Sequence, residues 1–538
     1  MSKSKNKNIS SLDVLIIGAG FSGIYMLKKI REMGLSARVI DAAAGVGGTW
    51  FWNRYPGARV DVESMFYSYS FDKTLEQEWE WTERYPAQPE ILNYINHVAD
   101  RFELRSHIQL STSVTSAIYD ENKATWLVST DGDHSFSARF CVMATGCLSA
   151  ANTPDFDGLK EFKGRIFHTG KWPHNDVDFS NRRVGVIGTG SSGVQIIPEI
   201  AKQAKHLTVF QRTASYVVEA FNRPLGATDQ ANTKANYHEL RDAAKKTFGG
   251  FTVVANDQSA LSVSEEECRN ALEEGWKAGG NSFLASYGDF STNIEANLRA
   301  QEFVRDKIRA TVQDAETLQN LLPQHIIGCK RLCLGTNYYD TYNRNNVTLV
   351  SLGENSVDHF TANSLVTESS QYQIDDLILA TGFDAMTGAL SRIHIQGRDK
   401  LELKQAWEAG PRNYLGLMTH GFPNFFTITG PGSPSVLTNM LPTIEQHVEW
   451  ISECIDYLQK EKIQEIEAEL QAQDNWTEHG NELALNTLRY SCSSWYLGAN
   501  VPGKPRVFMP YIGGMPSYRE KCSSVAASGY EGFKLTKI

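Results

Sequence analysis

The sequence predicts an α/β protein with two parallel, helix-covered sheets and a helical insert, and three observations indicate this. A glycine-rich loop follows an apolar run twice, at residues 18–23 and 188–193. An Ala-Thr-Gly turn follows a later apolar run in each half, at residues 144–146 and 380–382. The length of 538 residues exceeds what one hydrophobic core usually holds. Each half therefore has the pattern of a Rossmann-like dinucleotide-binding domain.

The first unit begins at residues 12–17, an apolar run typical of a strand buried on both faces of a parallel sheet. The loop glycines allow a tight turn, approach of a pyrophosphate, and close packing of the next helix. These are Gly18, Gly20 and Gly23, and Ser22 stands at the start of that helix. The second strand, residues 38–41, ends in Asp41 at the ~20-residue offset where a carboxylate binds ribose hydroxyls. The alternative is that Asp41 only caps the loop.

The second unit repeats the pattern with a strand at residues 183–187 and a helix at residues 191–201. Its loop is Gly188, Thr189, Gly190, Ser191, Ser192 and Gly193. After the next strand, Arg212 and Thr213 stand where a carboxylate would bind a 2′-hydroxyl. Because guanidinium donors match a phosphate, this predicts NADPH over NADH, unless Arg212 merely faces solvent.

Two further segments connect and flank these units. Residues 47–61 combine aromatic side chains with Gly, Asn, Arg and Pro, which indicates a loop, and aromatic loops tend to surround flat ligands. Residues 162–173 read F-K-G-R-I-F-H-T-G-K-W-P and stand between the two glycine loops. Taken alone, the histidine of this segment would more often serve in core packing or a loop hydrogen bond. Its place between two nucleotide loops favours a functional role.

The paired Ala-Thr-Gly turns predict that both nucleotide domains are discontinuous, each closed by a strand that arrives late in the sequence. We expect a first domain at residues 1–148 and 385–538 and a second at residues 149–220 and 331–384. A helical insert at residues 221–330 should shape the substrate cavity. Its stretches with helical spacing are residues 237–247, 265–277 and 302–319. A further amphipathic helix is expected at residues 442–458.

Composition limits the partners. A formal charge of −10 argues against nucleic acid, and no apolar run approaches the ~20 residues of a membrane span. The N-terminus, residues 1–11, lacks a signal-peptide pattern and is expected to be a frayed tail. The eight cysteines show no redox C-x-x-C and no zinc ligand set, so we expect reduced thiols, no metal and a cytoplasmic location. We expect a monomer or weak oligomer that acts on small molecules.

Two of these segments resemble the fingerprints of type I Baeyer–Villiger monooxygenases. Residues 47–61 match G-G-x-W-x-x-x-x-Y-P-G-x-x-x-D. The second fingerprint is carried by Phe162, Gly164, His168, Trp172 and Pro173. With residues 328–331, 429–435 and 494–506, the resemblance spans nearly the full chain and is closest to the phenylacetone monooxygenase branch. His174 departs from the acidic residue that many relatives have there.

This resemblance implies FAD in the first unit and NADPH in the second. The FAD contacts it implies are Gly18, Gly20, Ser22, Gly23, Asp41, Thr49, Trp50, Asp61, Tyr67, Val114 and Met440. The NADP contacts it implies are Arg59, Gly188, Thr189, Gly190, Ser191, Ser192, Gly193, Gln195, Arg212, Thr213, Lys330, Arg331 and Trp495. The ketone pocket it implies is Ser435, Val436, Leu437 and Met440.

The resemblance also implies the chemistry, in which reduced flavin and dioxygen form a C4a-peroxide that converts a ketone to an ester or lactone. It implies that sulfides are oxidised as well. A permanent cation beside it would keep the peroxide anionic and steady the oxyanion of the adduct. Arg331 is the candidate, held by Asp61; the alternative for Arg331 is a surface ion pair. His168 suits an interdomain hinge better than proton transfer.

Three other functions compete with this prediction. A monooxygenase that oxidises nitrogen or sulfur shares the paired loops but needs no cation beside its hydroperoxide, so Arg331 with Asp61 argues against it. A disulfide reductase is disfavoured because no redox cysteine pair follows the first unit. A non-catalytic redox sensor would consume no NADPH in response to a ketone.

Overall fold

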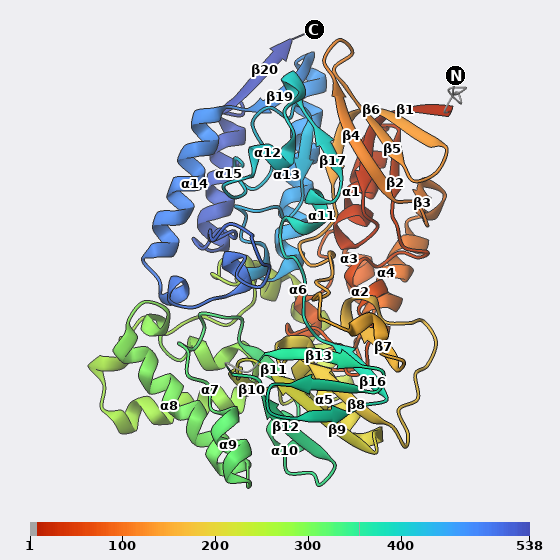
Figure 1. Ribbon diagram of the computed structural model, residues 1–538. Coiled ribbons are helices and arrows are strands. Elements are labelled where there is room, and N and C mark those ends of the chain that lie inside the picture. Colours follow the sequence, from red (N-terminus) through yellow and green to blue (C-terminus); the bar gives the residue numbers. More distant parts are fainter. Residues whose placement is uncertain (1–7, 354–355, 538) are drawn as a thin grey trace.

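The computed structural model describes residues 8–353 and 356–537, which fold around two large sheets, the first mixed because β5 runs antiparallel to β4 and β6, the second parallel (Figure 1). The first is an eight-stranded sheet in the order β17-β4-β5-β6-β1-β2-β3, and β18 pairs with β6. Its strands are β1 (Asn8–Ile17), β2 (Ala37–Ile40), β3 (Ile108–Gln109), β4 (Val114–Asp120), β5 (Thr125–Thr130), β6 (His134–Met143), β17 (His394–Gln396) and β18 (Phe425–Thr427).

Strand β1 is central in this sheet because its apolar residues are buried on both faces. It runs parallel to β2 and to β6, with Ile17 opposite Ile40 and Met143. The prediction of a tail up to residue 11 is wrong for residues 8–11, which extend β1 and pair with β6. Residues 1–7 lie outside the described part of the chain.

The second sheet has five strands in the order β12-β9-β8-β16-β7, all parallel. They are β7 (Arg165–His168), β8 (Arg183–Ile187), β9 (His206–Gln211), β12 (Val347–Ser351) and β16 (Asp376–Leu379). Residues 162–173 were expected to form a linker, but their middle is edge strand β7. Small ribbons add β10 (Val217–Glu219) with β11 (Cys333–Gly335), and β13 (Val357–Thr361), β14 (Ser364–Thr367) and β15 (Gln371–Gln373).

Helices flank both sheets, and α1 and α5 begin directly at the glycine loops. In the first part of the chain they are α1 (Phe21–Glu32), α2 (Thr49–Trp52), α3 (Lys73–Glu78), α4 (Gln88–Arg101) and α5 (Ser191–Gln203). Short helices α10 (Tyr338–Thr341), α11 (Gly388–Ser391) and α12 (Leu403–Ala406) follow the insert. The C-terminal part contains α13 (Met440–Lys460), α14 (Leu470–Leu485), α15 (Met515–Ala527) and the ribbon β19 (Ile463–Ala468) with β20 (Phe533–Lys537).

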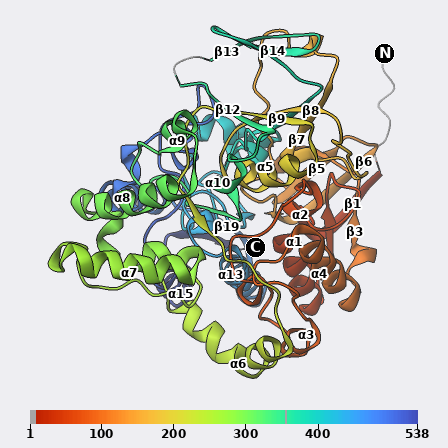
Figure 2. The ribbon, with the colours of Figure 1, turned by 90° about the horizontal axis from the view of Figure 1, so that it is seen from below.

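The insert is helical, as predicted, and projects to one side of the second sheet (Figure 2). Its helices are α6 (Ala227–Lys245), α7 (Glu265–Ala278), α8 (Ile294–Thr311) and α9 (Ala315–Leu321). The single helix predicted at residues 302–319 is two, because Asp314 accepts a hydrogen bond from Thr317 N at 2.8 Å and so caps a new helix. Within the described residues, no helix is both long enough and apolar enough to span a bilayer.

Candidate active site

Both glycine loops are built on the same plan. Gly18 has φ +114° and Gly188 has φ +109°, a region that side chains rarely adopt. A Cβ on Gly18 would lie 2.4 Å from the carbonyl oxygen of Ala144, and one on Gly188 would lie 2.5 Å from that of Ala380. Each Ala-Thr-Gly turn therefore closes against the first glycine of one loop.

The other loop glycines differ in their surroundings: the third glycine of each loop packs against the first, and Gly190 faces open space. A Cβ on Gly23 would lie 1.8 Å from the oxygen of Gly18, and one on Gly193 would lie 2.2 Å from that of Gly188. By contrast, a Cβ on Gly190 would meet nothing within 4 Å. The N-terminus of α5 thus begins beside open space, which fits a dinucleotide phosphate at a helix start, whereas before α1 a Cβ on Gly20 would lie 3.4 Å from the Cα of Gly48.

The position of Asp41 is compatible with both of its predicted roles, as a loop cap and as a ligand of ribose hydroxyls. Its Oδ2 accepts a hydrogen bond from Ala19 N at 2.6 Å and its Oδ1 accepts one from Ala43 N at 2.7 Å, so it does cap the loop. Each oxygen keeps a second lone pair for a ribose hydroxyl. Thr112 N donates to Asp41 O at 2.9 Å, which brings the start of β4, and with it Val114, to this edge of the sheet.

The aromatic loop lies over the first cradle. A Cβ on Gly20 would lie 3.4 Å from the Cα of Gly48, which directly precedes Thr49 and α2. The buried indole of Trp50 donates to the Tyr67 hydroxyl at 3.1 Å. The predicted flavin contacts Thr49, Trp50 and Tyr67 are therefore brought together beside the first glycine loop.

The same loop reaches the second unit through α5. The Tyr55 hydroxyl donates to Gln195 Oε1 at 2.7 Å, and Gln195 Nε2 donates to the carbonyl of Arg59 at 2.9 Å. A Cβ on Gly57 would lie 2.4 Å from the backbone oxygen of Gln195. The Arg59 guanidinium is paired with Glu83 at 2.8 Å, so its predicted contact with NADP would need that pair to open.

Arg212, Thr213 and Lys330 form a cationic site at the end of the second sheet. Arg212 and Thr213 are exposed, and Lys330 is half-buried. Burial, and then the positive charge of Arg212, hold the pKa of Lys330 below its ordinary value. Thr189 is buried beside them and donates to the carbonyl of Thr213 at 3.1 Å. Because the Arg212 charge disfavours the protonated form of Lys330, an anion near both, as a 2′-phosphate would be, would favour that form.

Arg331 and Asp61 form the central pair of the site. Arg331 Nε donates to Asp61 Oδ2 at 2.7 Å and Nη2 donates to Oδ1 at 2.8 Å, while Nη1 donates to the carbonyl of Val436 at 2.7 Å. The two side chains are only a third and a quarter exposed, so this is no surface ion pair. Burial alone would raise the pKa of Asp61, but the Arg331 charge holds it below its ordinary value.

The predicted ketone pocket lies directly against this pair. Ser435 and Val436 are buried, and Leu437 and Met440 are partly buried at the start of α13. Ser435 has φ +37°, a strained backbone position that turns the Val436 carbonyl to the guanidinium. Trp495 is half-buried, with its ring centroid 4.3 Å from that of Tyr496.

Sequence reasoning missed Cys147 and Tyr496 as members of this site. Both belong to the apolar cluster that contains Val436, with Leu497 and Phe508. Cys147 directly follows the first Ala-Thr-Gly turn, and that position was the available signal. Burial raises the pKa of its thiol above the ordinary value, so it is an uncharged neighbour of the pocket.

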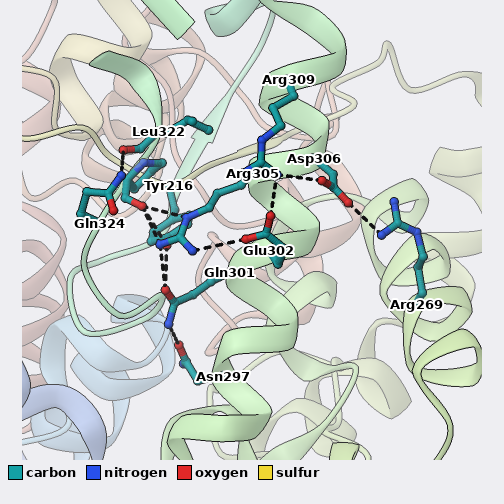
Figure 3. A network of polar contacts seen from close by, with 11 residues as sticks. Tyr216, Arg269, Asn297, Gln301, Glu302, Arg305, Asp306, Arg309, Leu322 and Gln324 are labelled. Atoms are coloured by element: carbon teal, nitrogen blue, oxygen red, sulfur yellow. Dashed lines mark hydrogen bonds and ion pairs between the residues drawn. The ribbon is translucent and has the colours of Figure 1, made fainter. Parts of the chain in front are cut away.

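The insert contacts the segment that precedes Lys330 and Arg331, and Figure 3 shows the side chains of Asn297, Gln301 and Arg305 on α8 that take part. From α8, Arg305 Nη2 donates to the carbonyl of Pro323 at 2.9 Å. The buried Asn297 donates to the carbonyl of Ile327 at 3.0 Å and accepts from Gln301 Nε2 at 2.8 Å. These contacts fix Pro323 and Ile327, the latter three residues before Lys330.

His168 lies where the two Ala-Thr-Gly regions approach each other. Its Nδ1 accepts from Gly170 N at 2.9 Å, so Nε2 carries the proton and faces the carbonyl of Asn152 at 3.2 Å and the Thr381 hydroxyl at 3.3 Å. Burial lowers its pKa. A neutral, fully engaged imidazole is consistent with the predicted hinge role.

The rest of the second fingerprint packs around β7. Phe162 and Trp172 are buried, and the ring centroid of Phe162 lies 6.0 Å from that of Phe360. A Cβ on Gly164 would lie 2.3 Å from the carbonyl oxygen of Asp375. Trp172 N donates to the carbonyl of Trp52 at 3.4 Å, with Pro173 following. The fingerprint therefore joins the second sheet to the aromatic loop.

The prediction of eight reduced cysteines is wrong for two of them. Cys329 and Cys492 are joined by a disulfide, with a Cα–Cα distance of 6.2 Å and a sequence separation of 163. Only the tertiary fold brings such distant residues together, so their spacing gave no signal. The other six cysteines are free and buried.

This geometry has close counterparts among known proteins. A family model described as flavin-binding monooxygenase-like matches residues 11–226. A Baeyer–Villiger monooxygenase of Pseudooceanicola batsensis is 42% identical over 525 residues, which cover 97% of this chain and 96% of that protein. The chain belongs to the Baeyer–Villiger monooxygenase family.

Two further relatives of this Baeyer–Villiger monooxygenase are similar over nearly its whole length. A solved structure of an oxidized steroid monooxygenase bound to NADP is 50% identical with a TM-score of 0.94, covering 98% of this chain and 100% of that one. A phenazine N-monooxygenase of Lysobacter antibioticus is 42% identical over 528 residues, covering 97% of each. The predictions of family, fold class, enzyme class, FAD and NADP are confirmed. The residue roles, the domain boundaries and the phenylacetone monooxygenase branch stay predictions.

Proposed function

We propose that this Baeyer–Villiger monooxygenase inserts one oxygen atom beside the carbonyl of a ketone, giving an ester or a lactone with NADPH and dioxygen. The observation that carries this is the Arg331 guanidinium, bound through two hydrogen bonds to Asp61 and through a third to the Val436 carbonyl. Bound FAD supplies the redox chemistry between NADPH and dioxygen. The chain's own side chains bind, orient and stabilise charge.

Arg331 is suited to stabilising negative charge on oxygen. Burial alone would lower its pKa, but the Asp61 carboxylate more than offsets this and raises the pKa of Arg331 above its ordinary value. The guanidinium therefore stays charged at every working pH. Asp61 fixes its plane and leaves little freedom to reorient, so no reorganisation is needed when charge develops on the substrate.

Apolar side chains border one side of the pair, around Val436. Val436, Tyr496 and Leu497 are buried in one apolar cluster with Cys147 and Phe508. A small apolar ketone fits such a lining better than a charged substrate, because a buried charge without a partner is costly. By family branch, we expect acyclic or aryl ketones over small rings.

The test is to incubate the purified, FAD-loaded chain with NADPH, dioxygen and a ketone panel of acyclic, aryl and cyclic members. The expected result is ketone-dependent NADPH consumption with an ester or lactone one oxygen atom heavier than the ketone by mass. NADPH consumption that is the same with and without each ketone would contradict the proposal and favour a sensor.

Heteroatom oxidation is a second candidate, favoured by the phenazine N-monooxygenase relative at 42% identity. Organic sulfides and aromatic amines belong in the same panel. Ketone oxidation needs the Arg331 charge at the reacting oxygen, whereas an electrophilic oxygen transfer to nitrogen or sulfur does not. Products that are N-oxides or sulfoxides alone, with no ester from any ketone, would make this the main activity.

We further propose a cytoplasmic monomer or weak oligomer. Six of the eight cysteines are free, which supports a reducing compartment, because most cysteines of secreted chains are paired in disulfides; the Cys329–Cys492 bond is the exception. Light scattering coupled to size-exclusion chromatography measures the mass in solution. A stable dimer or tetramer at micromolar concentration would contradict the prediction of weak association.

A further inference from the structure

The Cys329–Cys492 disulfide joins two segments that both reach the active site. Cys329 directly precedes Lys330 and Arg331. Cys492 belongs to what we term the Trp495 segment, residues 488–506, which also contains Tyr496. The bond closes a sequence separation of 163 residues at a Cα–Cα distance of 6.2 Å, inside the range that disulfides span.

The Trp495 segment is held differently at its two ends. Near its C-terminal end, Asn500 Nδ2 donates to the carbonyl of Phe383 at 2.7 Å, and Lys504 Nζ contacts Asp384 Oδ1 at 2.6 Å. Near its N-terminal end, the disulfide is a covalent link to the Lys330 side of the site. Breaking that bond would leave the residues around Trp495 held by packing and by the hydrogen bond from Met509 N to the Tyr496 carbonyl at 2.9 Å.

The two sulfurs differ in access. Cys329 is 1% exposed, whereas Cys492 is half-buried, so an external thiol meets the Cys492 sulfur first. Next to it, the hydroxyl of Ser494 is buried and has no hydrogen-bond partner among the described residues. An unpaired polar group at this place adds to the evidence that the segment closes around a polar ligand.

We propose that Cys329 and Cys492 are a reversible redox tether, which in its oxidised form holds the Trp495 segment against Lys330 and Arg331 and slows the release of NADP+. The inference rests on the NADPH-dependent function proposed above and on the predicted contacts of NADP(H) with Lys330 and Trp495. When the thiols are free, the Trp495 segment swings away more readily and NADP+ exchanges faster.

The oxidant is hydrogen peroxide, which accepts two electrons from the two thiols. One thiolate attacks a peroxide oxygen, giving a sulfenic acid and one water after proton uptake; the second thiolate displaces the hydroxyl as a second water and forms the S–S bond. In the reverse direction a dithiol attacks Cys492, passes through a mixed disulfide, and leaves as its own disulfide while both cysteines regain their protons.

The test uses the full FAD-loaded chain, either oxidised with hydrogen peroxide or reduced with dithiothreitol and then desalted. Non-reducing peptide mapping by mass reports the Cys329–Cys492 link, and stopped-flow fluorescence reports NADP+ release without turnover. We expect the linked peptide only after oxidation, with NADP+ release slower on the order of tenfold. Cys492→Ser should match the reduced wild type in both states. Cys268→Ser, a buried free thiol in the insert, should behave like the wild type.

Several outcomes would overturn the tether. These are no linked peptide after oxidation, a linked peptide with unchanged NADP+ release, or an oxidation response that survives in Cys492→Ser. Loss of FAD absorbance on reduction would show a structural bond instead of a switch. A chain that binds no NADP+ in either state would remove the proposed NADP(H) placement and the tether together, whereas equal release in both states would remove the tether alone.

Discussion

At the scale of single residues, three hydrogen bonds define the position of the Arg331 side chain. Replacement by alanine would remove all three. Arg331→Ala should still reduce flavin with NADPH but form ester at least about a hundredfold more slowly, as expected when one preorganised donor at a developing oxyanion is lost. Stopped-flow reduction at the flavin absorbance and product quantification separate the two steps.

Arg331→Lys is the matched control for charge without the planar fork. It should recover part of the ester formation, because an ammonium supplies the charge but cannot pair with Asp61 in the same geometry. Wild-type rates of ester formation in Arg331→Ala would contradict the proposed role, provided FAD remains bound.

Arg212 is expected to read the 2′-phosphate of NADPH. Arg212→Ala should lower the preference for NADPH over NADH roughly 10- to 100-fold, since a hydrogen bond to a charged group is worth ~1.5–3 kcal/mol. The measurement is kcat/KM for both nucleotides with one ketone. Because Arg212 is exposed, the variant should keep its melting temperature, and a preference that stays unchanged would show that it only faces solvent.

Lys330 gives the site a pH dependence whose sign follows from its environment. Burial, and then the charge of Arg212, lower the pKa of Lys330, so its ammonium discharges at a lower pH than an ordinary lysine. NADP+ affinity should therefore be full near neutrality and fall as pH rises through that lowered pKa. Titrations from about pH 7 to about pH 10 check this. Lys330→Arg should flatten the fall, and NADH, without the phosphate, should show none.

At the scale of elements, the second glycine loop offers a matched pair of substitutions. A methyl group at residue 193 would lie 2.2 Å from a backbone oxygen, whereas one at residue 190 would meet nothing within 4 Å. Gly193→Ala should lower the melting temperature or prevent folding. Gly190→Ala should fold normally and keep FAD, but bind NADP+ at least about tenfold more weakly, because the methyl occupies space that a pyrophosphate needs. Calorimetry and NADP+ titration measure both, and equal effects would contradict this placement.

Comparison of the predicted and observed helices and strands shows which of them local sequence patterns can predict. Strand β8 at Arg183–Ile187 and the first turn of α5 were predicted within a residue, because an apolar run followed by a glycine loop has few other solutions. The break between α8 and α9 was missed, since Asp314 looks like any helix surface residue until its carboxylate caps Thr317. Strand β7 was missed because its partner β16 is more than 200 residues away and supplies the pairing.

Sequence patterns predicted some residues of the candidate site and missed others. Glycines, Asp61 and Arg331 stand in recognisable patterns and are brought together. Cys147, Tyr496 and the Cys329–Cys492 bond come from the packing of distant segments, which no local pattern contains. Arg59 is the predicted contact least favoured by the geometry, because Glu83 already holds it.

At the scale of the whole molecule, His168 ties the connection that leads from the first nucleotide unit into the second, at Asn152, to Thr381 in the closing turn of the second unit. His168→Ala should keep FAD but slow flavin reduction by NADPH about tenfold or more, because the buried partners lose a hydrogen bond worth ~1 kcal/mol or more and the units lose their fixed orientation. Burial keeps its pKa low, so removing His168 should leave the pH profile above about pH 6.5 unchanged. A shifted pH profile would instead indicate proton transfer.

The Ala380 carbonyl against Gly188 also has a consequence for synthesis of the chain. The loop at residues 188–193 leaves the ribosome long before the segment that packs against it, which is β16 and the turn at residues 380–382. At ~5–20 residues per second, the wait is on the order of ten seconds or more. During that interval the nascent polypeptide exposes an unfinished pocket, so ribosome-bound chains halted before residue 380 should fail to be retained on an immobilised adenine-nucleotide resin, whereas chains released at full length should be retained.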